Sequence, residues 1–215
     1  MWEGLESRGY EQHRRQQSGP DSGRAVACRS RMHDSVSGGD EISTAENSVV
    51  IVVMGVSGVG KTTVGRALAR GLDWPFHDAD DLHSPASIDL MRSGTPLTDD
   101  QRQPWLSALA RLIGDHAREG RSMVLACSAL RRSHRMALLA ETPDPRDVRL
   151  VHLAAESDRL ADRLGRRAGH FFPAELLTTQ LDALEPPEPD ERVIVLDAMD
   201  PVDQLVQSIR TELDV

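Results

Sequence analysis

A glycine-rich loop between an apolar run and a helical pattern constrains the fold of this chain more than any other feature. Residues 55–62 read Gly-Val-Ser-Gly-Val-Gly-Lys-Thr, which matches the spacing G-x-x-x-x-G-K-[ST] without a mismatch. The run before it, residues 49–54, is continuously apolar and mostly β-branched, as in a parallel strand buried on both faces. Helical apolar spacing follows over residues 63–70 and stops at Gly71. This order of strand, glycine loop and helix predicts a loop that binds the phosphates of a nucleotide.

The loop contains Lys61, the only lysine among the 215 residues. Lysine is a compact point charge on a flexible stem, whereas arginine is a wide planar fork, and a tight phosphate loop has room only for the former. We therefore expect Lys61 to bridge the β- and γ-phosphates of ATP and the Thr62 hydroxyl to hold Mg²⁺. The expected nucleotide-binding residues are Gly55, Val56, Ser57, Gly58, Val59, Gly60, Lys61, Thr62 and Thr63.

Composition limits the partners of the chain. The formal net charge of −9 argues against nucleic acid or an anionic membrane surface as a partner, so a local arginine cluster must meet any anionic substrate. The two cysteines, Cys28 and Cys127, lie far apart and provide no disulfide framework. Because no apolar run is long enough for a membrane span or a signal peptide, the sequence predicts a cytoplasmic protein.

Residues 1–48 form a separate compositional zone. Gln, Ser, Gly, Arg and acidic residues dominate it, and no apolar periodicity is present. Such a segment buries too little apolar surface to offset the entropy of ordering it. We expect a disordered N-terminal extension there, with a translation start at Met32 or a regulatory tail as the alternatives. Residues 49–215 then form one domain, which is long enough for a proper core.

From residue 49 onward, strand patterns alternate with helical patterns, which predicts an α/β domain with a parallel sheet. The expected strands lie near residues 49–54, 74–80, 123–127, 148–153 and 193–196. Helical patterns lie at residues 63–70, 84–93, 131–140, 157–167, 176–184 and 201–213, and a stronger helix is expected to open at Pro104. Ligands of such sheets bind beyond the carboxyl ends of the strands.

Two acids, Asp78 and Asp80, stand at the end of the second expected strand. Alone, they could be solvated loop acids or a helix N-cap. Beside a phosphate loop they fit two tasks of phosphoryl transfer. One carboxylate orients the acceptor hydroxyl and accepts its proton, and the other contacts Mg²⁺ together with Thr62. The third expected strand has no acid at its tip, unlike ATPases and GTPases, which favours a small-molecule kinase.

Residues 159–173 concentrate arginines, then glycines, then two aromatic side chains. One interpretation is a solvated helix end whose basic residues complement the helix dipole. The other is a lid whose arginines swing over the triphosphate, neutralise charge on the transferred phosphoryl group and exclude water.

Six segments of the chain resemble the gluconate kinases of the small P-loop type. They are residues 54–63, 77–83, 94–106, 127–132, 169–173 and 181–187, in the order of the family. The phosphate loop alone identifies only a superfamily. The sequences Pro-Leu-Thr-Asp-Asp-Gln-Arg-Gln-Pro-Trp at residues 96–105 and Cys-Ser-Ala-Leu at residues 127–130 are far narrower. The resemblance spans nearly all of residues 49–215.

This resemblance implies a three-layer P-loop kinase fold, like that of the nucleoside monophosphate kinases. The expected domain is α/β, with a five-stranded parallel sheet, helices on both faces and a mobile lid at about residues 163–175. The implied reaction is the ATP-dependent phosphorylation of D-gluconate at its 6-hydroxyl, which gives 6-phospho-D-gluconate and ADP. The resemblance also implies Mg²⁺ as the metal, and a homodimer is common in the family.

The resemblance also implies roles for individual residues. Asp80, in preference to Asp78, is expected at the acceptor hydroxyl, and Arg102 at the substrate carboxylate. The expected catalytic residues are Lys61, Asp80, Asp78, Arg167 and Arg163, the last two as lid arginines. The expected substrate residues are Asp80, His83, Arg102, Ser128, Arg135 and His170, and the expected metal ligands are Thr62 and Asp78. Gln180 also matches the family pattern, without a role that we can assign.

Two other functions are compatible with the phosphate loop. A kinase of the same fold could act on shikimate or a nucleotide. However, residues 127–129 read Cys-Ser-Ala where a shikimate kinase would carry Gly-Gly-Gly, and no residues clearly suited to recognise a base are found. A non-catalytic regulator would bind ATP without acceptor-dependent turnover, and the joint presence of Lys61, Asp78 and Asp80 argues against it.

Overall fold

A five-stranded parallel sheet organises residues 48–165 and 174–215, the part of the chain that the computed structural model describes. The strand order is β2-β3-β1-β4-β5, and every neighbouring pair is parallel. The strands are β1 (Val50–Met54), β2 (Phe76–Asp78), β3 (Met123–Ala126), β4 (Val148–Ala154) and β5 (Ile194–Asp197). The predicted α/β fold with five parallel strands is confirmed. The predicted N-terminal extension lies outside the described residues, apart from Ser48, and stays a prediction.

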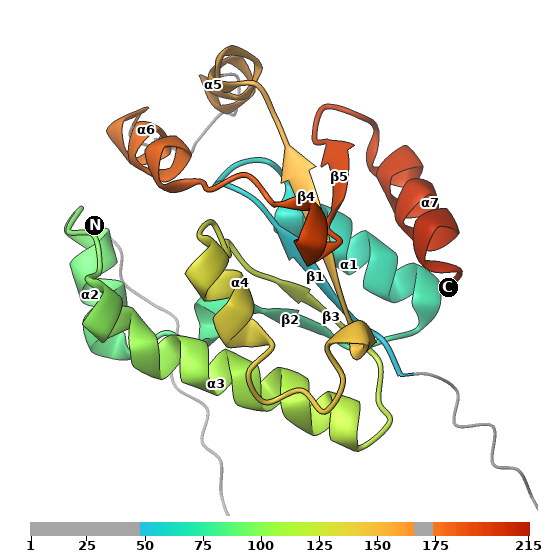
Figure 1. Cartoon of the computed structure of the whole chain (residues 1–215). Coiled ribbons are helices and arrows are strands. Elements are labelled where there is room, and N and C mark those ends of the chain that lie inside the picture. The colour runs from blue at the N-terminus through green and yellow to red at the C-terminus, as the bar shows by residue number, and fades with distance from the viewer. Residues whose placement is uncertain (1–47, 166–173) are drawn as a thin grey trace, which may run out of the picture. The chain divides into compact units, whose positions relative to one another are not determined.

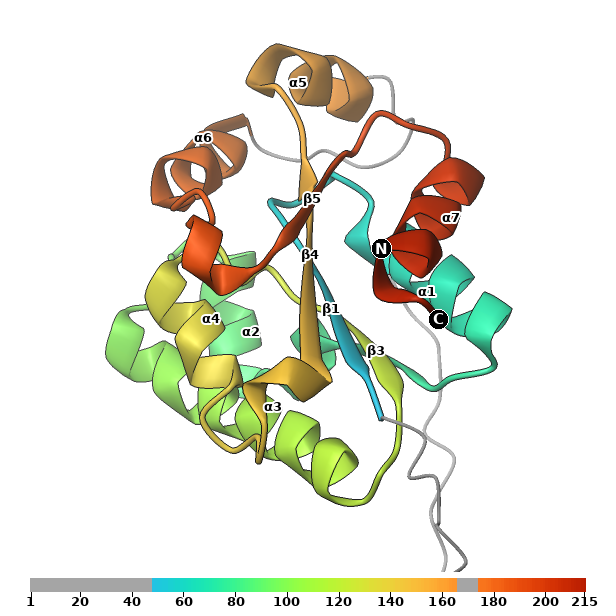
Figure 2. The same ribbon diagram turned by 45° about the vertical axis from the view of Figure 1, so that its right-hand side comes forward.

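Helices cover both faces of the sheet, and α5 (Ser157–Gly165) and α6 (Ala174–Ala183) lie beyond its carboxyl edge (Figure 1, Figure 2). One face is covered by α1 (Lys61–Leu72) and α7 (Val202–Leu213), and the other by α3 (Asp99–Arg118) and α4 (Arg132–Leu138). The remaining elements are α2 (Pro85–Arg92) and the 3₁₀ helices η1 (Ala79–Leu82), η2 (Pro145–Asp147) and η3 (Pro189–Glu191). No helix within the described residues is both long and apolar enough to cross a membrane.

The position of β1 in the middle of the sheet explains why its sequence is continuously apolar. All five of its residues are 0% exposed. Ile51 and Val53 belong to the core under α1 and α7, whereas Val50, Val52 and Met54 belong to the core under α3 and α4. A strand with helices on both faces has no solvent-facing side, so neither set of alternating positions is polar. The phosphate loop therefore leaves the sheet from its most buried strand.

Helix α3 begins at Asp99, well before the expected start at Pro104. The Thr98 hydroxyl accepts a hydrogen bond from the Gln101 backbone N–H at 3.3 Å, and Gln101 Oε1 accepts one from the Thr98 N–H at 2.9 Å. This reciprocal arrangement is a capping box, and it fixes the start of the helix. Pro104 lies inside the helix, so the expected boundary was wrong because a capping signal outranks a proline as the marker of a helix start.

Gly114 in α3 is packed against the segment that follows α4. A Cβ at this position would meet the Glu141 carbonyl oxygen at 2.5 Å, which is too close for carbon and oxygen. We expect Gly114→Ala to lower the free energy of unfolding by about 1–3 kcal/mol, because backbone must move to make room. A Cβ on Gly71 in α1 meets nothing within 4 Å, so Gly71→Ala should raise the same quantity by about 0.5–1 kcal/mol. Urea unfolding measures both, and effects of the same sign would contradict this packing.

Candidate active site

The phosphate loop, residues 55–60, joins β1 to α1. Gly55 has a φ of 140°, and a Cβ there would lie 2.7 Å from the Leu153 carbonyl oxygen, so no side chain fits. Gly60 is the N-cap of α1 with a φ of 104° and supplies no side-chain cap, and the first turn contains no acid. The first N–H groups of α1 are therefore available to an anion, which the helix dipole also favours.

Lys61 turns its ammonium group back over this loop. Its Nζ donates a hydrogen bond to the Val56 carbonyl oxygen at 3.1 Å. Burial lowers the pKa of Lys61, while the charges of Asp80 and Asp78 act in the opposite direction. Phosphate oxygens in the loop would compensate the buried ammonium, so the side chain is already placed for a nucleotide.

Thr62 and Asp78 form the side of the site that suits a metal ion. The Thr62 hydroxyl donates to Asp78 Oδ2 at 2.9 Å, and Asp78 Oδ1 accepts the Asp80 backbone N–H at 3.2 Å. Hydroxyl and carboxylate oxygens are the hard ligands that Mg²⁺ takes in nucleotide sites, where phosphates and water complete its shell. The described residues hold no group of three or more His, Cys, Asp or Glu that could bind a metal unaided. The pair therefore fits a Mg²⁺ ion that is shared with a triphosphate.

Asp80 stands next to this pair, at the mouth of the site. Asp80 is an exposed residue by surface area, although the surrounding protein removes part of the water from its carboxyl group. This desolvation, reinforced by the charge of Asp78, raises the pKa of the Asp80 carboxyl, against the opposing charges of Lys61 and His83. A carboxylate with a raised pKa is a better proton acceptor than an ordinary one, so Asp80 suits the task of a general base.

His83 and Trp105 form one wall of the site. Their rings are stacked, with centroids 4.5 Å apart and planes at 8°. Trp105 is 6% exposed, and its Nε1 donates to the Ala79 carbonyl oxygen at 2.7 Å, which fixes the indole. His83 Nδ1 is buried and has no hydrogen-bond partner within the described residues. Burial lowers the pKa of His83, so a neutral imidazole faces the site and can bind a hydroxyl group.

Arg102 and Ser128, both expected at the substrate, lie on different segments of the chain. Arg102 lies near the start of α3, where its Nη1 is 3.3 Å from Asp99 Oδ1. Ser128 follows β3, and its carbonyl oxygen accepts the Gly55 N–H at 3.3 Å. This hydrogen bond holds the segment after β3 against the start of the phosphate loop, so both residues stay candidates for contact with an acceptor.

Arg135 is occupied elsewhere, and the expectation that it contacts the substrate needs correction. Its side chain is 1% exposed, with Nε 2.6 Å and Nη2 2.9 Å from the two carboxylate oxygens of Glu191. Its Nη1 donates to the carbonyl oxygens of Leu130 and Glu185, each at 3.1 Å, and more weakly to that of Ala129. A guanidinium enclosed and bonded in this way has no face left for a substrate. Arg135 instead ties α4 to the segment between α6 and β5.

The predicted lid cannot be placed in the same way. Arg167 and His170 lie outside the described residues, as does the side chain of Arg163 in α5. Their expected roles stay predictions.

Gln180 has a contact that the sequence did not reveal. Its Oε1 accepts the Ser57 backbone N–H at 2.6 Å, and its Nε2 donates to Ser57 Oγ at 3.0 Å. Because Gln180 lies in α6 and Ser57 in the phosphate loop, these two bonds join the helix after the predicted lid to the loop itself. The two residues are far apart along the chain, which is why no local pattern could indicate this pairing.

Comparisons with known proteins agree with this geometry. A family model described as an AAA domain matches residues 50–187. The probable gluconokinase of Xenopus tropicalis is 42% identical over 178 residues, which are 77% of this chain and 94% of that protein. The chain belongs to the gluconokinase family. The gluconokinase of Gluconobacter oxydans (strain 621H) is 48% identical over 144 residues, which are 67% of this chain and 79% of that protein. The family membership expected from the sequence is thus confirmed.

Solved structures agree with both the family and the fold. The crystal structure of a gluconokinase from Sinorhizobium meliloti 1021 has a TM-score of 0.70 at 40% identity, covering 77% of this chain and 91% of that one. A shikimate kinase from Bacteroides thetaiotaomicron has a TM-score of 0.56 at 23% identity, covering 78% of this chain and 99% of that one. The second likeness is one of fold alone, so this gluconokinase-family chain shares an architecture with shikimate kinases.

The buried pair of Arg135 and Glu191 leads to a prediction about stability and pH. The hydrogen bonds from Arg135 lower the pKa of Glu191 from 4.5 to about 2. Because the folded-state pKa is the lower one, this stabilisation is complete above pH 4.5 and is lost as the pH falls toward 2. A shift of this size corresponds to about 3 kcal/mol. Arg135→Met should lower the free energy of unfolding at pH 7 by about 3–5 kcal/mol, since it leaves a buried carboxylate unpaired.

Urea unfolding at several pH values measures this effect. The Arg135→Met variant should lose less stability than the wild type between pH 5 and pH 2. Arg146→Met is the matched control, because Arg146 pairs with Asp144 at the exposed surface, where water screens the interaction. Equal effects of the two substitutions would show that the buried pair has no special weight.

The Gln180 contact leads to a prediction about nucleotide binding. Gln180→Leu removes both bonds to Ser57, so we expect a KM for ATP about tenfold higher, the effect of roughly two ordinary hydrogen bonds. The control is Gln207→Leu on α7, where the glutamine contacts only the exposed Thr211. Steady-state kinetics with ATP varied measures the effect. A KM unchanged in Gln180→Leu would mean that the loop keeps its shape without α6.

Proposed function

We propose that this chain transfers the γ-phosphoryl group of ATP to the 6-hydroxyl of D-gluconate, giving 6-phospho-D-gluconate and ADP. Relatives that are named gluconokinases and are 42% and 48% identical support this proposal. The observation that carries it is the position of Asp80, a carboxylate with a raised pKa. Asp80 lies near the Lys61 ammonium group, which faces the phosphate loop, and near the His83 imidazole.

On the nucleotide side, the chain supplies positive charge and N–H donors. The open N–H groups at the start of α1 bind phosphate oxygens, and Lys61 moves from the Val56 carbonyl to the β- and γ-phosphates. This cation stabilises the charge that spreads over the transferred phosphoryl group. Thr62 and Asp78 would hold the Mg²⁺ ion, which would neutralise phosphate charge when bound. Arg163 and Arg167 are proposed to add positive charge from the lid.

On the acceptor side, Asp80 orients the hydroxyl and accepts its proton as the new O–P bond forms. The neighbouring Asp78 contributes to this role through its charge, since a nearby negative charge makes the Asp80 carboxylate a stronger proton acceptor. His83 contributes a neutral imidazole that is held flat against Trp105, a rigid surface for a chain of hydroxyl groups. A homodimer and a cytoplasmic location stay predictions.

An ADP-release assay with gluconate, related sugar acids, shikimate and nucleoside monophosphates tests the proposal. We expect selective turnover of gluconate, and Asp80→Asn should lower kcat by about 10²–10⁴-fold, the usual contribution of a general base. The Kd for ATP should change little in this variant. The matched control is Asp81→Asn, which alters the adjacent exposed acid and should leave kcat near that of the wild type. Selective turnover of another acceptor would overturn the proposed substrate, and a Kd effect alone would reassign Asp80 to the metal.

A further inference from the structure

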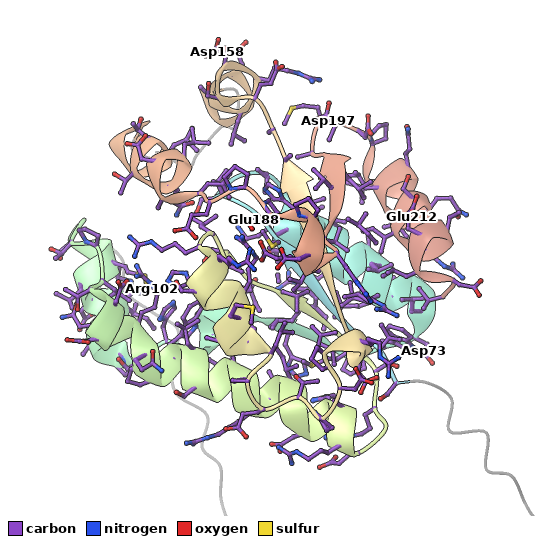
Figure 3. The ribbon with its side chains drawn as sticks, viewed as in Figure 1. Asp73, Arg102, Asp158, Glu188, Asp197 and Glu212 are labelled. Carbon is purple, nitrogen blue, oxygen red and sulfur yellow. The ribbon has the colours of Figure 1, made fainter. Side chains whose placement is uncertain are left out.

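Two arginines from separate helices meet at a single carboxylate on the acceptor side of the site. Arg102 lies near the start of α3 (Figure 3), and Arg131 is the N-cap of α4. Arg102 Nη1 lies 3.3 Å from Asp99 Oδ1, and Arg131 Nη1 lies 3.1 Å and 3.2 Å from Asp99 Oδ1 and Oδ2. Asp99 therefore bridges two elements that the sequence separates widely.

The charges of this cluster do not balance. Asp99 is the only acid within ion-pair distance of either Arg102 or Arg131 among the described residues, so two guanidinium groups share one carboxylate. Burial lowers the pKa of Arg102, and the positive charge of Arg131 adds to that effect. His134 faces the same two arginines, and burial and their charges lower its pKa, so it stays neutral near pH 7. The cluster thus has one positive charge to spare, which suits one carboxylate of a ligand.

The neighbouring arginines of α4 lack this spare charge. Arg132 pairs with both Glu188 and Asp190, at 2.5 Å and 2.6 Å, and Arg135 is enclosed against Glu191. Of the three arginines at residues 131, 132 and 135, only Arg131 shares its counter-ion with another cation. The sequence analysis placed Arg135 at the substrate, and the ion pairs favour Arg131 instead.

The cluster is also connected to the proposed general base through His83. The His83 ring is stacked on Trp105, which lies in the same helix as Arg102, and the charges of Asp80 and Arg102 act on the pKa of His83 in opposite directions. An extended acceptor would therefore place one terminal hydroxyl at Asp80, its middle along His83 and its other end at the arginines. A straight-chain polyhydroxy acid has this distribution of groups.

We propose that Arg131 and Arg102 together bind the carboxylate of the acceptor, and that Asp99 holds the two guanidinium groups in position when no acceptor is bound. This inference rests on the proposed function and adds Arg131 and Asp99 to its site. Guanidinium forks bind carboxylates through paired, charge-assisted hydrogen bonds. A neutral sugar alcohol of the same length cannot compensate the spare charge, so the cluster selects acids over neutral acceptors.

The test compares Arg131→Met with Arg131→Lys and the wild type. We expect Arg131→Met to raise the KM for D-gluconate by about 10- to 100-fold, which is the effect of losing a charge-assisted hydrogen bond. The KM for ATP should stay within about twofold. Arg131→Lys, which keeps the charge and loses the fork, should give an intermediate KM. The control is Arg118→Met, which removes an exposed arginine near the far end of the same helix as Arg102 and should leave both KM values unchanged.

A second measurement separates the selective role from a structural one. D-Glucitol, the neutral counterpart of gluconate, serves as a competing ligand, and its inhibition constant against gluconate should be the same in the wild type and Arg131→Met. Asp99→Asn should leave the KM for gluconate unchanged or lower it, because the substrate no longer competes with an internal carboxylate. A gluconate KM within twofold of wild type in Arg131→Met, or an equal loss for glucitol, would overturn the inference.

Failure of the proposed function can be distinguished from failure of the proposed carboxylate site. If the wild type does not phosphorylate gluconate, thermal unfolding with and without gluconate, shikimate or a further sugar acid still tests the arginine cluster. Stabilisation by an acid in the wild type that is lost in Arg131→Met supports the carboxylate site and rejects only the proposed substrate. The same stabilisation in both proteins, or none in the wild type, rejects the site.

Discussion

The Thr62 hydroxyl and the Asp78 carboxylate meet across the end of β3, and much of the candidate site depends on this contact. Thr62 follows β1, Asp78 ends β2, and β3 lies between these two strands. The segment after β3 reads Cys-Ser-Ala and contains no acid, unlike ATPases and GTPases, in which an aspartate and the loop Ser/Thr hold Mg²⁺. The carboxylate beside Thr62 comes instead from the end of β2. The same carboxylate accepts the Asp80 N–H, and thereby sets the position of the proposed base.

A second set of contacts connects α4, by way of the segment between α6 and β5, to the phosphate loop. The segment between α6 and β5 is held on α4 by Arg132 and Arg135, and the Glu185 N–H donates to the Leu130 carbonyl oxygen at 2.9 Å. This anchoring keeps α6 next to the phosphate loop, where Gln180 binds Ser57. The ion pairs of Arg132 and Arg135 therefore stabilise the fold. Arg131, which is proposed to bind the acceptor, caps the same helix. Removal of one partner should cost more for the buried pair of Arg135 and Glu191 than for the exposed pairs, because it leaves a buried charge without a counter-ion, whereas water screens exposed charges.

The sequence could predict what depends on neighbours along the chain. The phosphate loop, the buried strand before it and the acids that end β2 are local patterns, and each was found where expected. The start of α3 was also encoded locally, in Thr98 and Gln101, but a proline was taken as the stronger signal. Arg135 was expected at the substrate and Arg131 was given no role, because their partners Glu191 and Asp99 lie far from them in sequence and no local pattern indicates these pairs. The same is true of Gln180, whose partner is in the phosphate loop.

Because Lys61 is the only lysine of the chain, its ε-amino group can be labelled and observed selectively. Every other side-chain cation is an arginine or a histidine, and the lowered pKa of Lys61 increases the fraction of neutral, nucleophilic amine. An acylating reagent that is specific for amines therefore has a single side-chain target, and it directly follows the phosphate loop. Isotopic labelling of the lysine side-chain nitrogen likewise yields one side-chain resonance, which reports directly on whether the loop holds an anion. The enzyme's reacting centre can thus be observed without introducing any foreign probe.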